Sequence, residues 1–81
     1  MERLHNKSRL AGIKQVKKAI LANRAETAFI AKDCAPYIIE ELENLCRENS
    51  VPIVYAETMK ELAKACRVEV PTAAAVTVKP E

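Results

Sequence analysis

Apolar residues recur at helical spacing in three segments of the chain. In residues 13–22, 36–48 and 58–66 an apolar position returns every three or four residues, which predicts a helix with one buried face. Pro36 suits the start of the second helix, because its missing N–H costs nothing in a first turn. Thr58-Met59-Lys60-Glu61 matches a capping box, in which the threonine and glutamate side chains satisfy free N–H groups at a helix start.

Short apolar runs alternate with these helices and predict strands. Residues 27–31, 52–55 and 74–78 have the composition and length of buried strands, and residues 8–11 are expected to add a brief edge strand. Residues 1–8, with Leu4 as their apolar anchor, are expected to form a short helix. Strands that alternate with helices of this length imply an α/β fold with helices on both faces of a small sheet.

The composition is that of one small globular domain spanning residues 1–81. Hydrophobic residues make up 49% of the chain and charged residues 30%, which excludes a disordered protein. The single glycine excludes Gly-rich phosphate loops and dinucleotide-binding fingerprints, which need two or three. No apolar run approaches the ~18 residues of a membrane span, and the N-terminus lacks the apolar core of a signal peptide, so we expect a cytoplasmic protein.

Neither the cysteines nor the histidine indicates a metal or cofactor site. Cys34, Cys46 and Cys66 are odd in number and contain no Cys-x-x-Cys pair, which argues against a disulfide framework and against a zinc site. A metal site made from them and His5 would need four separate segments to converge. We therefore expect three buried thiols, no metal and no cofactor.

The residue types that most often catalyse reactions have no evident partners in this sequence. No serine or cysteine can be placed beside His5, and Asp33, which follows a predicted strand, has no evident partner. The solvent-exposed face of the second predicted helix carries Glu40, Glu41 and Glu43. Without an acid–base pair, the sequence favours a protein that is not an enzyme.

The charge is distributed unevenly along the chain. The formal net charge is +2, yet residues 1–24 hold seven basic residues and one acid, a net +6, while the remainder carries −4. A basic end of this kind suits a polyanion such as a nucleic acid. A solvated surface that is merely rich in lysine remains the alternative at this point.

The first candidate binding segment is Gly12-Ile13-Lys14-Gln15 with the helix that follows it. Gly12 permits a sharp turn and a close approach by a ligand, and a helix N-terminus attracts anions. Lys14 and Lys18 lie on one face, and Gln15 can read a base edge with its amide. The alternative is an amphipathic helix with a lysine-rich wet face.

The second candidate is the loop Arg67-Val68-Glu69-Val70-Pro71-Thr72, which is unusually apolar. Side chains such as Val68 and Val70 commonly tuck into the local core. They can instead pack against an unstacked base, as recognition of irregular RNA requires.

These segments, taken in order, resemble the kink-turn RNA-binding ribosomal protein family, and most of all its small bacterial homologues. The resemblance covers nearly the whole chain, from the Gly-x-Lys-Gln segment through residues 29–33 and 51–53 to residues 59–66 and 68–75. It implies a three-layer α-β-α sandwich around a four-stranded mixed sheet. It also implies binding to a kink-turn, a sharply bent RNA helix with tandem sheared G·A pairs beside a three-nucleotide bulge.

The resemblance also implies a role for each candidate residue. Gly12 and Ile13 lead the segment that enters the widened groove, Lys14 and Gln15 contact the guanine edges, and Lys18 meets a backbone phosphate. The loop residues pack against the extruded bulge nucleotide: Val68, Glu69, Val70 and Pro71. Lys32 is a further phosphate contact.

The chain departs from the family pattern at three places. Archaeal members have Asn-Glu where this chain has Lys14-Gln15, which shifts contacts towards charge. Many bacterial relatives have Gly where Arg67 stands, which bears on how freely the loop bends. Ala35 replaces an Asp that often precedes the helix-starting proline, which removes an N-cap.

The hypothesis is a monomeric, non-enzymatic protein that binds kink-turn RNA, ribosomal or regulatory, with no membrane and no small-molecule substrate as partner. The main alternative is a small protein-interaction module that docks its basic end on an acidic partner. A small enzyme is the third alternative, and it needs a ligand pocket that this composition does not suggest.

Overall fold

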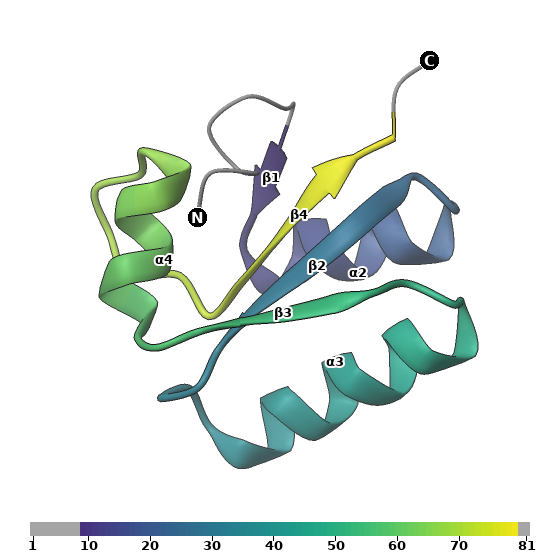
Figure 1. Cartoon of the computed structure of the whole chain (residues 1–81), viewed down its shortest axis with the longest axis horizontal. Helices are drawn as coiled ribbons and strands as arrows, with labels where there is room; N and C mark the ends of the chain where they lie inside the picture. The colour runs from purple at the N-terminus through teal and green to yellow at the C-terminus, as the bar shows by residue number, and fades with distance from the viewer. Residues whose placement is uncertain (1–8, 80–81) are drawn as a thin grey trace.

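The computed structural model describes residues 9–79, which form three helices and four strands (Figure 1). In chain order the elements are β1 (Arg9–Ala11), α2 (Ile13–Leu21), β2 (Ala25–Ala31), α3 (Pro36–Glu48), β3 (Ile53–Ala56), α4 (Met59–Cys66) and β4 (Ala74–Val78). Every helix and strand predicted within this range is present. The short helix expected over residues 1–8 lies outside the described residues.

The largest difference from the predicted boundaries is at the start of β2. This strand begins at Ala25, two residues before the predicted start, because Ala25 pairs with Val78. The register shifts between Ala25 and Thr27, so Glu26 lies at an irregularity of the ladder. A half-buried glutamate at such an irregularity interrupts the apolar run by which a buried strand is recognised.

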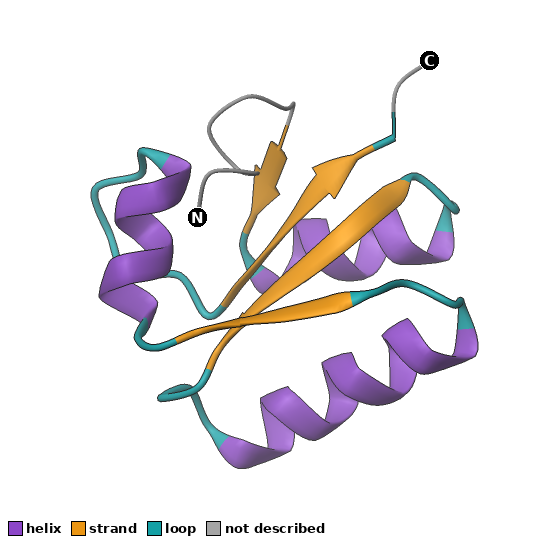
Figure 2. Ribbon diagram, viewed as in Figure 1, coloured by secondary structure: helices purple, strands orange, loops and turns teal. Residues whose placement is uncertain are grey.

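The four strands form one mixed sheet in the order β1-β4-β2-β3 (Figure 2). Strand β4 runs antiparallel to both β1 and β2, whereas β2 and β3 are parallel. Strands β1, β2 and β3 therefore all run in one direction. Their carboxyl ends meet at the same edge of the sheet, beside the start of β4.

Helices cover both faces of the sheet, as the resemblance implied. Buried residues of α2 and α3 pack on the face that carries Ala28, Ile30 and Val76. Helix α4 packs on the opposite face, which carries Phe29 and Ala75. The two sets of strand residues alternate along β2 and β4, because successive side chains of a strand point to opposite faces. The three-layer α-β-α sandwich is thus confirmed.

The three cysteines are buried and unpaired, as predicted. Cys34 and Cys46 lie in the core cluster under α2 and α3, and Cys66 lies in the cluster under α4. Desolvation by burial is the main cause that raises the pKa of each thiol. Their contribution is therefore that of small apolar side chains.

Helix α4 is capped at its start by two side chains. The Thr58 hydroxyl accepts a hydrogen bond of 2.9 Å from the Glu61 N–H, as the capping-box pattern predicted. The Asp33 carboxylate accepts a second bond, of 2.7 Å, from the Met59 N–H. The sequence showed no catalytic partner for Asp33, and the structure gives this carboxylate a capping role instead, with a backbone group 26 residues away. Helix α3, by contrast, has Ala35 at its N-cap and no side-chain cap.

No helix within residues 9–79 is long and apolar enough to cross a membrane.

Removing the Thr58 cap is expected to destabilise the protein measurably. Thr58→Ala leaves the Glu61 N–H without its acceptor and should lower the free energy of unfolding by about 1 kcal/mol in urea titrations. Thr58→Ser keeps a hydroxyl at the same place and is the matched control. Equal stability of the Ala and Ser variants would show that the hydroxyl contributes nothing.

Candidate nucleic-acid interface

Gly12, Lys32 and the end of the loop before β4 are held at one edge of the sheet. The Gly12 N–H donates to the Ala74 carbonyl at 2.9 Å, and the Ala31 N–H donates to the Ala73 carbonyl at 2.9 Å. The Lys32 N–H donates to the Ala56 carbonyl at 2.8 Å. These bonds follow from the strand directions, which bring the carboxyl ends of β1, β2 and β3 together.

Gly12 is required here by its backbone conformation. Its φ is +102°, a value that side-chain-bearing residues rarely adopt, whereas a Cβ added at this position would meet no heavy atom within 4 Å. The space above Gly12 is therefore open to an approaching ligand. Among residues 9–79 no side chain caps the start of α2, so the positive end of the helix dipole lies at the same place.

The three lysines of α2 divide into two groups. Lys14 and Lys18 are exposed and form no ion pair with any residue in 9–79, and Gln15 is exposed beside them. Lys17 forms an ion pair with Glu41 of α3. Ile13 is half-buried at the start of the helix. The predicted contact residues Lys14, Gln15 and Lys18 are therefore those that remain available to a ligand.

Lys32 reaches the same edge, but its charge is partly engaged. Its Nζ lies 2.9 Å from Oε1 of Glu57, which follows β3, and both side chains are more than half exposed. Surface pairs of this kind contribute about 0–1 kcal/mol, so the ammonium can exchange Glu57 for another anion. Sequence reasoning missed Glu57, because only the parallel pairing of β2 and β3 brings the two residues together.

The loop between α4 and β4 presents its apolar side chains to solvent. Val70 is 68% exposed and Val68 is 36% exposed, and Glu69 and Pro71 are exposed as well. Of the two alternatives for these valines, burial in the local core is therefore wrong. Thr72, in contrast, is buried and donates its hydroxyl hydrogen to the Ala74 carbonyl at 3.0 Å.

Both ends of this loop are held beside the segment that leads into α2. At one end, Nε of Arg9 in β1 donates to the carbonyl of Cys66 at 3.3 Å. At the other end, the Gly12 N–H donates to Ala74. The two candidate segments predicted from the sequence, 55 residues apart from Gly12 to Arg67, are thus tied to each other by bonds at the residues that flank the loop.

Arg67 begins the loop in the left-handed conformation, with φ 59° and ψ 37°. Its N–H donates to the Lys64 carbonyl, and the Val68 N–H donates to the Ala63 carbonyl at 3.0 Å, which ends the helix. Glycine is the usual residue at such a helix end, because a Cβ costs free energy there. Arg67, at a position where many bacterial relatives have glycine, therefore strains the backbone. The loop nevertheless keeps its sharp turn.

Comparisons with known proteins agree with this fold. A model of the Ribosomal protein L7Ae/L30e/S12e/Gadd45 family matches residues 2–81. The chain belongs to this family. An RNA-binding protein of Caldanaerobacter subterraneus subsp. tengcongensis is 37% identical to this family member over 70 residues, which cover 86% of this chain and 85% of the relative. An RNA-binding protein of Halalkalibacterium halodurans is 37% identical over 68 residues, which cover 84% and 82%.

Two solved structures show the same family fold. The 15.5kD RNA binding protein of Giardia lamblia has a TM-score of 0.82 and 31% identity over 91% of this chain. This chain spans 62% of the Giardia protein, less than two thirds of its length. A protein of unknown function from Bacillus halodurans C has a TM-score of 0.81 at 17% identity, covering 89% of this chain and 72% of that one. The second likeness shows that the fold is kept where the sequences have largely diverged.

Glycine at position 67 is expected to stabilise this family member. Arg67→Gly removes the Cβ from a left-handed residue and should raise the free energy of unfolding by about 1 kcal/mol, measured by thermal or urea unfolding. Arg67→Ala also removes the guanidinium but keeps the Cβ, so it is the control and should not stabilise. A Gly variant no more stable than the Ala variant would contradict the proposed strain.

Proposed function

We propose that this protein is a non-enzymatic RNA-binding protein that recognises kink-turn RNA, or RNA bent in a similar way, and stabilises its bent form. The observation that carries the proposal is the common edge of the sheet. There, a helix start whose exposed lysines form no ion pair within residues 9–79 is joined by hydrogen bonds to the residues that flank a loop with exposed valines. The names of the two bacterial relatives and of the Giardia structure, each called an RNA-binding protein, support the partner class.

The start of α2 supplies the polar contacts. The open space above Gly12 admits the RNA groove at the sheared G·A pairs, and half-buried Ile13 lies at the helix start. Exposed Lys14 and Gln15 then donate to the guanine edges, because guanine presents acceptors at N7 and O6. Lys18, one helical turn further, meets a backbone phosphate.

The loop after α4 supplies the apolar contact. Val68, Val70 and Pro71 pack against the base of the extruded bulge nucleotide, and Glu69 lies among them as a hydrogen-bond acceptor. Unstacked bases need such a surface, because their faces are exposed to water once they leave the helix. Lys32 contributes a phosphate contact by exchanging its partner Glu57.

Binding stabilises the bent form of the RNA by selecting it. A free RNA of this kind exchanges between straight and bent conformations, and the protein shifts the equilibrium by its higher affinity for the bent one. Only the bent form presents a widened groove to the start of α2 and, at the same time, an extruded base to the loop after α4. We expect the cellular target to be a ribosomal or regulatory RNA and the protein to act as a monomer.

A gel-shift comparison tests the proposal. The protein should bind a bent RNA with intact G·A pairs and should bind the same RNA with Watson–Crick substitutions much more weakly. Gln15→Ala should cost roughly 1–3 kcal/mol on the bent RNA and reduce the discrimination between the two. Asn44→Ala, which removes an amide from α3, is the control. Equal or absent binding to both RNAs would favour an acidic protein as the partner of the basic edge.

The salt dependence of binding tests the phosphate contact of Lys18. Each phosphate that a lysine neutralises releases a counterion, so Lys18→Ala should lower the slope of log K against log salt by about one unit. Arg47→Ala removes a cation from α3 instead and should leave the slope unchanged. An unchanged slope in the Lys18 variant would remove this residue from the interface.

A further inference from the structure

Two exposed cations lie past the carboxyl end of α2, beyond the proposed RNA site, and continue from the two exposed lysines of that site. Lys14 and Lys18 lie one helical turn apart on the exposed side of α2. Arg24 and Lys79, at the opposite edge of the sheet, extend this row past the carboxyl end of the helix. We call these four residues the cationic track. From Lys14 to Leu21 at the end of α2 the track runs about 10 Å, at ~1.5 Å per helical residue.

The far end of the cationic track is held in place by the backbone. Asn23 adopts a positive φ of 57° after α2, and the Arg24 N–H then donates to the Ala19 carbonyl at 2.9 Å. The Lys79 N–H donates to the Arg24 carbonyl at 2.8 Å, which places both cations side by side where β2 begins and β4 ends. Lys79 also donates from Nζ to the Asn23 amide oxygen at 3.0 Å.

The charge of the cationic track is not neutralised within residues 9–79. Lys17 pairs with Glu41 and Lys32 pairs with Glu57, whereas no track residue forms an ion pair with another described residue. The Asn23 amide that accepts from Lys79 is neutral, so it orients the ammonium without cancelling its charge. Arg24 and Lys79, which the proposed RNA site does not use, thus remain available to phosphates beyond Lys18.

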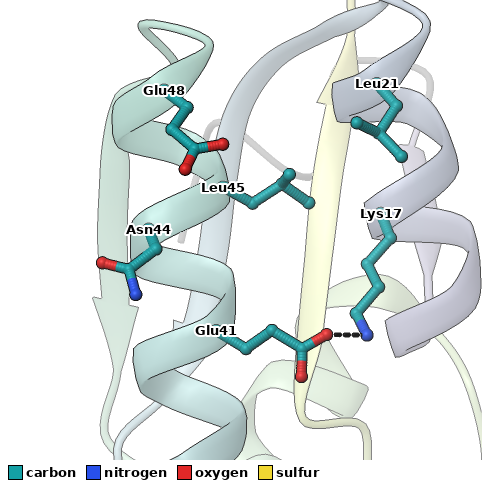
Figure 3. A pocket seen from close by; sticks show the side chains of 6 residues that line it. All are labelled: Lys17, Leu21, Glu41, Asn44, Leu45 and Glu48. Atoms are coloured by element: carbon teal, nitrogen blue, oxygen red, sulfur yellow. Dashed lines mark ion pairs between the residues drawn. The ribbon is translucent and has the colours of Figure 1, made fainter.

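An apolar groove and an acidic helix bound the cationic track on one side. Figure 3 shows the groove between α2 and α3, about 370 Å³ in volume, with Leu21 and Leu45 facing each other across it (Figure 3). Glu48 lies on the α3 side, and the pair of Lys17 with Glu41 closes one end. Because these carboxylates repel phosphate, a polyanion on α2 is confined to the side away from α3.

We propose that the cationic track binds the phosphates of a duplex stem that continues from the bent RNA. This inference rests on the proposed function, which anchors the RNA at the Gly12 end of the track. A stem leaving that anchor along α2 presents a row of phosphates, whereas a single anion would need only one of the four cations. Because successive phosphates of one strand of an A-form RNA stem lie roughly 3 Å apart along its axis, the helical part of the track spans about three to four base pairs.

RNAs with stems of different length test the cationic track. A minimal bent RNA is compared with two longer ones, each extended by about eight base pairs, twice the span of the track, on one side of the bend. One extension should steepen the slope of log K against log salt by about two units, because Arg24 and Lys79 then neutralise two more phosphates. The other extension leads away from α2 and should change little. No steepening with either extension, or equal steepening with both, would overturn the inference.

Two variants and one control test whether Arg24 and Lys79 cause the steeper salt dependence. Arg24→Gln should remove about half of the steepening on the productive RNA, and Arg24→Gln with Lys79→Gln should remove all of it. Arg47→Gln, the same substitution on α3, should leave it intact. A double variant that binds the long RNA as the parent does would exclude the track. None of these variants should change binding of the minimal RNA. If the parent protein failed to bind the minimal RNA, that result would count against the proposed function and not against the track alone.

Discussion

The pairing of β4 between β1 and β2 is the constraint on which the arrangement of the molecule depends. Because β4 is antiparallel to both neighbours, β1 and β2 run in the same direction and end at one edge, and β3 joins them by parallel pairing. The hydrogen bond from the Gly12 N–H to the Ala74 carbonyl continues this pairing past the end of β1. It joins the start of α2 to the end of the loop after α4.

A division of charge between α2 and α3 follows from their packing on the same face of the sheet. The lysine of α2 that points towards α3 is paired with a glutamate, whereas the two exposed lysines form no ion pair within the described part of the chain. The exposed cations therefore face away from the acidic helix. A chain whose net charge is only +2 in this way keeps exposed lysines of α2 on the side away from α3.

Local patterns were sufficient for the elements of the fold, since caps and periodicity act over a few residues. The start of α3 at Pro36 and the Thr58 cap of α4 both appeared where the sequence indicated them. The irregular start of β2 and the capping role of Asp33 were not predictable, because each depends on a partner far away in the chain. The valines of the loop illustrate the same limit, since composition alone allows burial or exposure.

The sequence by itself determined the kinds of residue available: a helix start led by the single glycine and rich in lysine, an apolar loop, and an order of segments that identifies the family. Tertiary structure decided which of them meet. Strand direction brought Gly12, Lys32 and Ala73 to one edge, and helix packing determined that Lys17, not Lys14 or Lys18, meets an acidic partner. Such outcomes depend on contacts between distant residues, whose free energy appears only when the sheet has formed.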